Sequence, residues 1–202
     1  MKFMHRTSLG LAAFLTAVAA QAAPLNTGSY VLGSQLSSPG SFDAMVASAS
    51  AGTATLAFQL AGFASLDGAD NGYSDVFHLS VNGTEVFTGS FNLGGGGFNA
   101  IQFNPNGATA VTTTYGATGD PQNSDEVTWA GGVTDISLSI ALLSGNNTVT
   151  FAYTGGSQGL GDEAWGLNSG SVTAAVPEPE TYALMLAGLG AIGMFARRRK
   201  SA

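Results

Sequence analysis

The feature that most constrains the fold of this chain is an apolar/polar alternation with a period of two. TATLAFQLAGF alternates through Leu56, Phe58 and Leu60, and VTDISLSIALL and NNTVTFAYTG repeat the pattern further along. Successive side chains on a strand point to opposite faces, so this alternation is typical of half-buried β-strands. No stretch between residues 23 and 176 sustains a helical period. The body of the chain is therefore predicted to be all-β.

Turn residues between these stretches indicate an antiparallel arrangement. SDVFHLSVNGTEVFTGSF is typical of a hairpin, because Asn82-Gly83 suits the positive φ that a type I′ turn needs at both central positions. AWGLNSGSVTAAV is the expected last strand, and NLGGGGFN is expected to be a flexible loop because it lacks the Gly-Lys-Ser/Thr ending of a phosphate loop. We expect an antiparallel two-sheet sandwich of jelly-roll type, with a closed barrel as the alternative.

The charge distribution narrows the choice of partners. All six basic residues lie near the ends, at positions 2, 6 and 197–200, whereas eleven acidic residues and no Lys or Arg lie between positions 23 and 176. Such a body cannot neutralise phosphates, so no nucleic-acid partner is expected. Divalent cations are its natural partners. The absence of cysteine excludes disulfides and thiolate metal sites.

The N-terminal segment has the three parts of a secretory signal peptide. Basic residues precede an apolar run, and Ala20-Gln21-Ala22 supplies the small-x-small cleavage pattern. We expect residues 1–22 to be removed by signal peptidase between Ala22 and Ala23. An N-terminal membrane anchor is the less favoured alternative, because the apolar run is short.

The C-terminal segment predicts a short transmembrane helix. The expected helix is residues 181–196, and its apolar run from Tyr182 to Ala196 spans roughly 22 Å at ~1.5 Å per residue, against a hydrocarbon core of ~30 Å. The basic cluster that follows is expected to stop transfer and to stay on the cytoplasmic side; it consists of Arg197, Arg198, Arg199 and Lys200. Everything before residue 176 is then exported across the inner membrane.

Pro177, Glu178 and Pro179 precede this helix, and the order of motif, apolar helix and basic tail resembles the PEP-CTERM sorting signal of Gram-negative bacteria. The resemblance implies that an exosortase cuts near the motif, so that contact with the inner membrane is transient. The expected organisation is a signal peptide at 1–22, an extracellular β-sandwich domain at 23–175 and a sorting signal at 176–202.

Two acidic clusters are the candidate metal ligands. LDGADNGYSDVF precedes the hairpin and GLGDEAWGLNS precedes the last strand, and each combines carboxylates with Asn and Gly. Calcium takes six to eight oxygen ligands, which such loops can supply, although the spacing does not fit an EF-hand. Our hypothesis is that both loops share one calcium ion, with candidate ligands Asp67, Asp70, Asp75, Asp162, Glu163 and Asn168. The alternative is a set of solvated turn residues.

The second cluster also resembles a recurrent ending of secreted bacterial jelly-roll modules, Asp-Glu-x-Trp-Gly-(Ile/Leu)-(Asp/Asn), here at residues 162–168. The hairpin at 75–84 matches a second motif of the same modules, Asp-x-Phe-x-(Leu/Val)-x-Val-Asn-Gly-Thr. This resemblance implies the fold more than an activity. Asn168 stands where the pattern often has Asp, which weakens the metal ligand set that the resemblance implies.

Catalytic candidates are few. His78 is the only histidine left after export, and its strand parity places it on the outward face, with Val76 and Ser80. There is no Gly-x-Ser-x-Gly elbow, and Asp162 and Glu163 are adjacent, so on a strand they would point to opposite faces. No catalytic residue is predicted. The aromatic residues are expected in the core rather than in a sugar-stacking platform; they include Trp129, Trp165, Tyr73, Tyr115 and Tyr153.

The sequence thus favours a non-enzymatic protein of the cell surface or the extracellular biofilm matrix, with a structural or adhesive role and with calcium as its candidate cofactor. A carbohydrate-binding module for exopolysaccharide is the alternative. A glycan-active enzyme, which would need a carboxylate pair facing a cleft, is the least favoured.

Overall fold

The computed structural model describes residues 23–24, 36–115, 130–174 and 185–193. The predicted signal peptide, the Pro177–Pro179 motif and the basic tail at 197–200 lie outside the described residues, as does Trp129. The described strands are β1 (Ala23–Pro24), β2 (Leu36–Ser37), β3 (Gly40–Ser48), β4 (Gly52–Ala64), β5 (Val76–Val81), β6 (Thr84–Ser90), β7 (Ala100–Phe103), β8 (Thr109–Thr114), β9 (Ala130–Leu142), β10 (Gly145–Thr154) and β11 (Glu163–Ala174).

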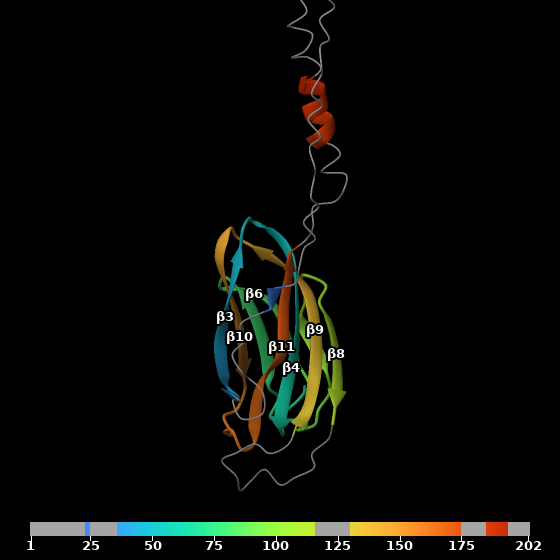
Figure 1. Ribbon diagram of the computed structural model, residues 1–202. Helices are drawn as coiled ribbons and strands as arrows, with labels where there is room; N and C mark the ends of the chain where they lie inside the picture. The colour runs from blue at the N-terminus through green and yellow to red at the C-terminus, as the bar shows by residue number, and fades with distance from the viewer. Residues whose placement is uncertain (1–22, 25–35, 116–129, 175–184, 194–202) are drawn as a thin grey trace, which may run out of the picture.

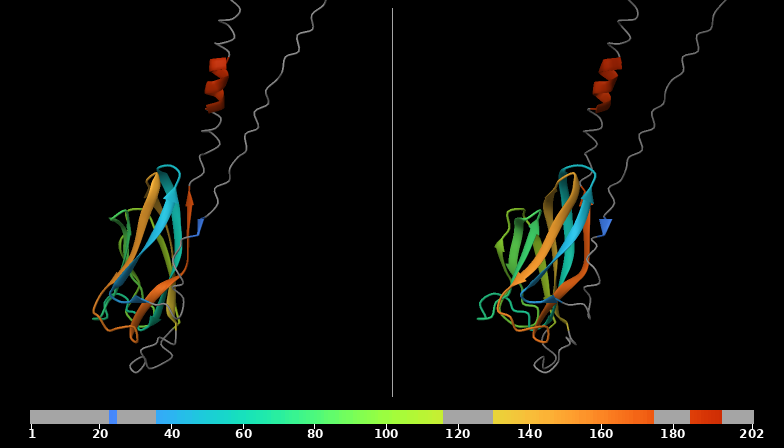
Figure 2. Two further views of the ribbon diagram at one scale, coloured as in Figure 1. Left: turned by 60° about the vertical axis from the view of Figure 1, so that its left-hand side comes forward. Right: turned by 90° about the vertical axis from the view of Figure 1, so that its left-hand side faces the viewer.

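The strands form two antiparallel sheets packed face to face. Sheet A has the order β1-β11-β4-β9-β8, with β2 also paired to β11, and sheet B has the order β3-β10-β5-β6-β7. Figures 1 and 2 show an elongated sandwich whose strands run close to its long axis. Among the described residues no strand ladder joins the two sheets into a closed barrel. The predicted jelly-roll-like sandwich is confirmed.

Aromatic side chains fill the space between the sheets. Phe42 stacks on Phe151 with ring centroids 5.0 Å apart, and Trp165 lies 5.2 Å from Tyr153 in an edge-on contact. Trp165 is fully buried, and its indole nitrogen donates a hydrogen bond to the Ser37 carbonyl oxygen. Each fully buried aromatic side chain favours the folded state by about 1.5–3 kcal/mol over an exposed one. The expected core position of Trp165 and Tyr153 is confirmed, so neither ring can stack on an external sugar. The same expectation is wrong for Tyr73 and Tyr115, which lie outside the strands and are exposed.

The segments in which apolar and polar residues alternate form strands in the structure. The inward positions Leu56, Phe58 and Leu60 of β4 are buried, and β10 and β11 occupy the expected segments. Asn82 and Gly83 have φ of 51° and 78°, as the predicted hairpin turn between β5 and β6 requires. The sequence pattern does not predict β1, β2, β3, β7 or β8. Weak alternation explains the omission of β7, where three of four residues are exposed.

The glycine-rich stretch differs from its predicted role as a flexible loop. Its backbone is hydrogen-bonded to the segment that follows β4, through Gly68 N–H to the Gly96 oxygen at 2.9 Å and Ala69 N–H to the Phe98 oxygen at 2.8 Å. Glycine here permits close packing of two backbones.

The described part of the C-terminal segment is a helix at residues 185–193 with exposed side chains. Within the part of the chain that the structure describes, no helix is both long enough and apolar enough to cross a membrane.

Candidate metal centre

Three carboxylates meet at one end of the sandwich. Asp67 lies in the loop after β4, Asp75 directly precedes β5, and Glu163 is the first residue of β11. β4 and β5 belong to different sheets, so the group bridges sheet A and sheet B at the lower end in Figure 1, where β4 ends. The exposed fraction is 5% for Asp67 and 0% for Asp75 and Glu163. We call these three residues the acidic triad.

Strand parity explains why these acids are buried. Asp75 continues the inward row of Phe77 and Leu79 on β5, and Glu163 lies two positions before the inward Trp165 on β11. Side chains at i and i+2 of a strand share a face. Both carboxylates therefore extend the hydrophobic interior at its end instead of facing water.

The geometry of the triad fits one cation. One ligand atom from each carboxylate lies within 4.8 Å of the other two. Oxygens bound to calcium at ~2.4 Å are at most about 4.8 Å apart when they lie on opposite sides of the ion. The three side chains can therefore bind a single calcium ion together, with loop carbonyl oxygens or water completing its six to eight ligands.

Each member of the triad is held by a neutral hydrogen-bond donor. Ser38 Oγ donates to Asp75 Oδ1 at 2.5 Å, and Gln158 Nε2 donates to Glu163 Oε1 at 2.5 Å. Asn71 Nδ2 donates to Asp67 Oδ1. The sequence reading did not identify these three donors. The Asx-type turn at Asn71, whose Oδ1 accepts from the Tyr73 N–H, was the available signal.

Two buried polar atoms near the triad have no hydrogen-bond partner. In the described part of the chain they are Glu163 Oε2 and Tyr153 Oη. Both residues are fully or almost fully buried, and both interact electrostatically with Asp75. Buried polar atoms are nearly always paired, and an unpaired one costs free energy. A bound cation with its water ligands would satisfy this need.

Two glycines allow the backbone to close around the triad. A Cβ atom added to Gly95 would collide with the Ser65 carbonyl oxygen and with Asp67 Oδ1, and one added to Gly155 would collide with Asp75 Oδ1. The glycine-rich stretch therefore forms a wall of the site, and a larger residue at position 95 would displace Asp67.

Burial dominates the electrostatics of the site. It raises the pKa of Asp67 to about 6, and the charges of Asp75 and Asp162 add to the effect. It raises the pKa of Glu163 to about 7, again with a contribution from Asp75. Burial also raises the pKa of Asp75, although hydrogen bonds with Ser38, the Asp67 backbone and the Glu163 side chain oppose this. The three carboxyl groups therefore keep their protons to higher pH than exposed carboxyl groups do.

The other three candidate ligands lie around the triad or away from it. Asp162 is half-buried and accepts a hydrogen bond from Ser65 Oγ at 2.5 Å. Asp70 is exposed, with a φ of 60° that belongs to the turn. Asn168 is exposed and donates to Gln59 Oε1 at 2.8 Å on the outer face of sheet A.

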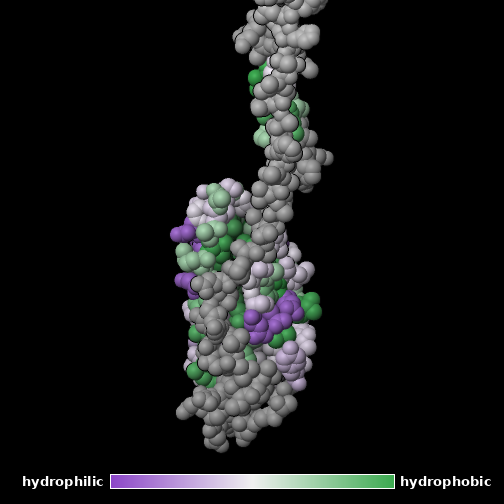
Figure 3. All heavy atoms as spheres, in the orientation of Figure 1, coloured by the Kyte–Doolittle hydropathy of each residue, from purple (hydrophilic) through white to green (hydrophobic). Residues whose placement is uncertain are grey.

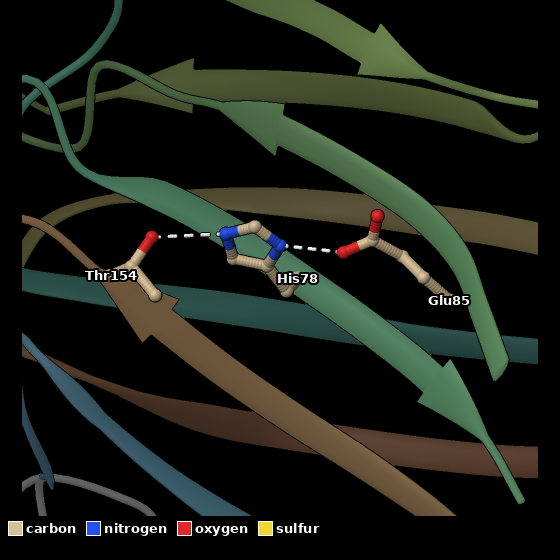
Figure 4. A network of polar contacts seen from close by, with 3 residues as sticks. All are labelled: His78, Glu85 and Thr154. Carbon is tan, nitrogen blue, oxygen red and sulfur yellow. Dashed lines mark hydrogen bonds and ion pairs between the residues drawn. The ribbon is translucent and has the colours of Figure 1, made fainter. Parts of the chain in front are cut away.

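His78 forms a separate polar network on the outer face of sheet B. Its Nε2 lies 2.9 Å from Thr154 Oγ1 and its Nδ1 lies 2.7 Å from Glu85 Oε1. Figure 4 shows the three side chains in a line across β10, β5 and β6. The order hydroxyl, imidazole, carboxylate is that of a catalytic triad. Here the hydroxyl belongs to a strand threonine, and the contacts connect neighbouring strands.

An open groove of about 360 Å³ lies on the outer face of sheet A. Asn168, Gln59 and Asp135 form a chain of hydrogen bonds beside it, with Gln59 Nε2 donating to Asp135 Oδ1 at 2.9 Å. Figure 3 shows hydrophilic side chains gathered over β4 and β9 on this side. Four of its ten lining residues carry hydroxyl groups, namely Thr109, Ser137, Ser169 and Ser171, and most of the lining surface is apolar.

The comparisons with known proteins concern the tail and the fold. A family model described as the PEP-CTERM protein-sorting motif matches residues 175–200. The tail is thus a substrate signal for an exosortase, and the chain is exported and sorted to the cell exterior. A search of curated proteins finds no match. Among solved structures, a family 35 carbohydrate-binding module from an environmental isolate is 13% identical, with a TM-score of 0.36, over 78% of this chain and 90% of that chain.

Proposed function

We propose that this exosortase-sorted protein has a non-catalytic structural or adhesive role at the cell surface or in the extracellular matrix, and that one calcium ion stabilises it. The ion is bound by Asp67, Asp75 and Glu163. The observation that carries the calcium assignment is Glu163 Oε2, a fully buried carboxylate oxygen that has no hydrogen-bond partner among the described residues yet belongs to a triad of suitable size.

The chemistry of the donors favours calcium over other metals. All ligands are carboxylate oxygens, the choice of hard cations, and the chain has no cysteine for softer metals. Magnesium demands a near-ideal octahedron and usually keeps several waters. A buried site closed by glycine backbone favours the larger and more adaptable calcium ion.

The non-catalytic part of the proposal is supported by the position of the ionisable groups. The acidic triad is buried between the sheets, where a polymeric substrate cannot reach it. The His78 network connects three strands across a sheet face, and it is 31% exposed at the imidazole. Neither arrangement combines an accessible cleft with a carboxylate pair.

Calcium titration by calorimetry tests the site directly. We expect one ion per chain, with a dissociation constant in the ~10⁻⁴ to 10⁻³ M range of extracellular modules, and weaker binding of magnesium. Asp75→Asn should abolish binding, and Asp70→Asn, an exposed change in the same loop, should preserve it. Unchanged affinity in Asp75→Asn would refute the assignment.

The location of the mature protein tests the cellular role. Cells that express the intact chain should export a product without the C-terminal segment, detected by its mass in the surface or matrix fraction. Deletion of residues 177–202 should prevent this sorting. Full-length protein that stays in the inner membrane of cells with an intact exosortase would contradict the proposal.

Exopolysaccharide binding is the second candidate role, favoured by the groove on sheet A. The hydroxyls of Ser137, Ser169 and Ser171 make no hydrogen bond within the described residues, so they are available to a polyhydroxylated ligand. Electrophoresis in gels that contain dextran, galactomannan or alginate is the test. Ser137→Phe fills the groove and should abolish retardation, whereas Ser139→Phe, on the same strand outside the groove, should not. Equal mobility in all gels would exclude this role for these glycans.

A further inference from the structure

The acidic triad joins segments of both sheets at one end of the sandwich. Asp67 and Asp75 come from the β4–β5 loop, and Glu163 comes from the start of β11, far along the chain. Ser38, which lies between β2 and β3, donates to Asp75 across 37 sequence positions. An ion held by the triad therefore fixes both sheets and several connections at one end of the domain.

No side chain of the body can take the place of this ion. Every Lys and Arg lies at positions 2, 6 or 197–200. His78 is on the outer face of sheet B, where it is paired with Glu85. Buried carboxylates without a cation lose hydration and repel one another, which is strongly unfavourable. With its carboxylates charged, the closed arrangement of the triad is therefore unfavourable until a cation arrives.

We infer that calcium binding and closure of this end of the sandwich are one event, so that the domain completes its folding only after export. This inference rests on the calcium site proposed above. Extracellular calcium modules bind with dissociation constants of ~10⁻⁴ to 10⁻³ M, whereas cytosolic sensors respond at ~10⁻⁷ to 10⁻⁵ M. A site of the first kind binds no ion at cytosolic calcium levels. The sandwich then stays open at the triad until it meets the calcium of the exterior.

Trp165 reports this closure. It lies two residues after Glu163, is fully buried, and donates from its indole to the Ser37 carbonyl oxygen. The variant Trp129→Phe leaves it as the single tryptophan. Mature protein collected from the exterior of producing cells is unfolded in denaturant and diluted into EGTA, magnesium or calcium. Trp165 fluorescence, protease resistance and calorimetric binding are then measured on the same samples.

We expect Trp165 to be solvent-exposed and the β4–β5 loop to be cleaved by protease in EGTA and in magnesium. Calcium should shift the emission to shorter wavelength and protect the loop, with a midpoint equal to the calorimetric dissociation constant. If calcium binds but Trp165 is as shielded from solvent in EGTA as it is in calcium, closure is not coupled to binding, although the calcium site itself is confirmed. If no heat of binding is measured, the proposed calcium site itself fails.

Charge-neutral variants test the cause. Glu163→Gln removes one of the repelling charges. In EGTA, Trp165 should therefore be more shielded from solvent in this variant than in the unaltered chain. The calcium concentration at the midpoint of the fluorescence shift should be at least ten-fold higher. Asp67→Asn, which neutralises a different member, should act in the same direction. The matched control Asp70→Asn should behave like the unaltered chain. If Trp165 is as exposed in EGTA in both triad variants as in the unaltered chain, charge repulsion within the triad is not what keeps this end of the domain open.

Discussion

The acidic triad and the His78 network use similar residues to opposite effect. At the triad, three carboxylates are buried at the end of the core, and one oxygen of Glu163 has no hydrogen-bond partner in the part of the chain that the structure describes. On sheet B, Glu85 is paired with His78, whose second nitrogen is bonded to Thr154, and the group is partly exposed. The first network is incomplete without a ligand, whereas the second is complete.

The difference shows where a polar group affects the stability of this fold. Water screens an exposed pair, whose measured contribution is typically about 0–1 kcal/mol. A buried polar group has no such screening, so removal of its partner costs more than the interaction itself contributed. Perturbations of the triad should therefore have large, calcium-dependent effects. Perturbations of the His78 network should have small effects without calcium dependence.

Asp75→Ala should produce the largest loss of stability. It removes a calcium ligand and leaves Ser38 Oγ and the Asp67 N–H, both bonded to Asp75, without their acceptor. Each unpaired buried group costs about 1–3 kcal/mol, and an ion at 100 times its dissociation constant contributes about 2.7 kcal/mol. In calcium we expect the melting temperature to fall by roughly 10 °C or more. Asp70→Asn is the control. A similar fall in the melting temperature of that variant would show that the loss of stability is not specific to the triad.

The second prediction concerns the pH dependence of the metal-free protein. Burial raises the pKa of Asp67 from 3.8 to about 6 and that of Glu163 from 4.5 to about 7, so the folded state holds protons that the unfolded state has released. The stability contributed by these groups is present below about pH 4 and is lost as the pH rises to about 7. In EGTA, the melting temperature should fall by roughly 5–10 °C between pH 4.5 and 7.5. A rise over this range would contradict the assigned pKa shifts.

Most of the fold, but only part of the acidic triad and its surroundings, could be predicted from the sequence. Alternation located β4, β9, β10 and β11, because their inward residues are apolar and their outward residues polar. The same parity places Asp75 and Glu163 in line with Phe77 and Trp165, a signal that separates them from the exposed Asp70. The partners Ser38 and Gln158 have no sequence signature, since ordinary polar residues in loops reach the triad only through tertiary packing.

Gly95→Ala should have a smaller effect that is again linked to calcium. The new Cβ would overlap the Ser65 carbonyl oxygen and Asp67 Oδ1, so the loop must shift away from the triad. Overpacking of this kind typically costs about 1–3 kcal/mol, equivalent to a decrease of roughly 5 °C in the melting temperature. Calcium affinity should fall as well. Gly156→Ala, which meets no atom within 4 Å, is the control, and equal affinities in the two variants would refute the role of the glycine wall.

His78→Ala should have the smallest effect and no link to calcium. The substitution removes both hydrogen bonds of the imidazole, but Glu85 and Thr154 are close to water and can be hydrated. An exposed pair of this kind contributes about 0–1 kcal/mol, so the melting temperature should change by less than roughly 4 °C. The change should be equal in calcium and in EGTA, measured by paired thermal scans. A larger loss in calcium than in EGTA would mean that the two networks are coupled through β5, which contains His78 and which Asp75 directly precedes.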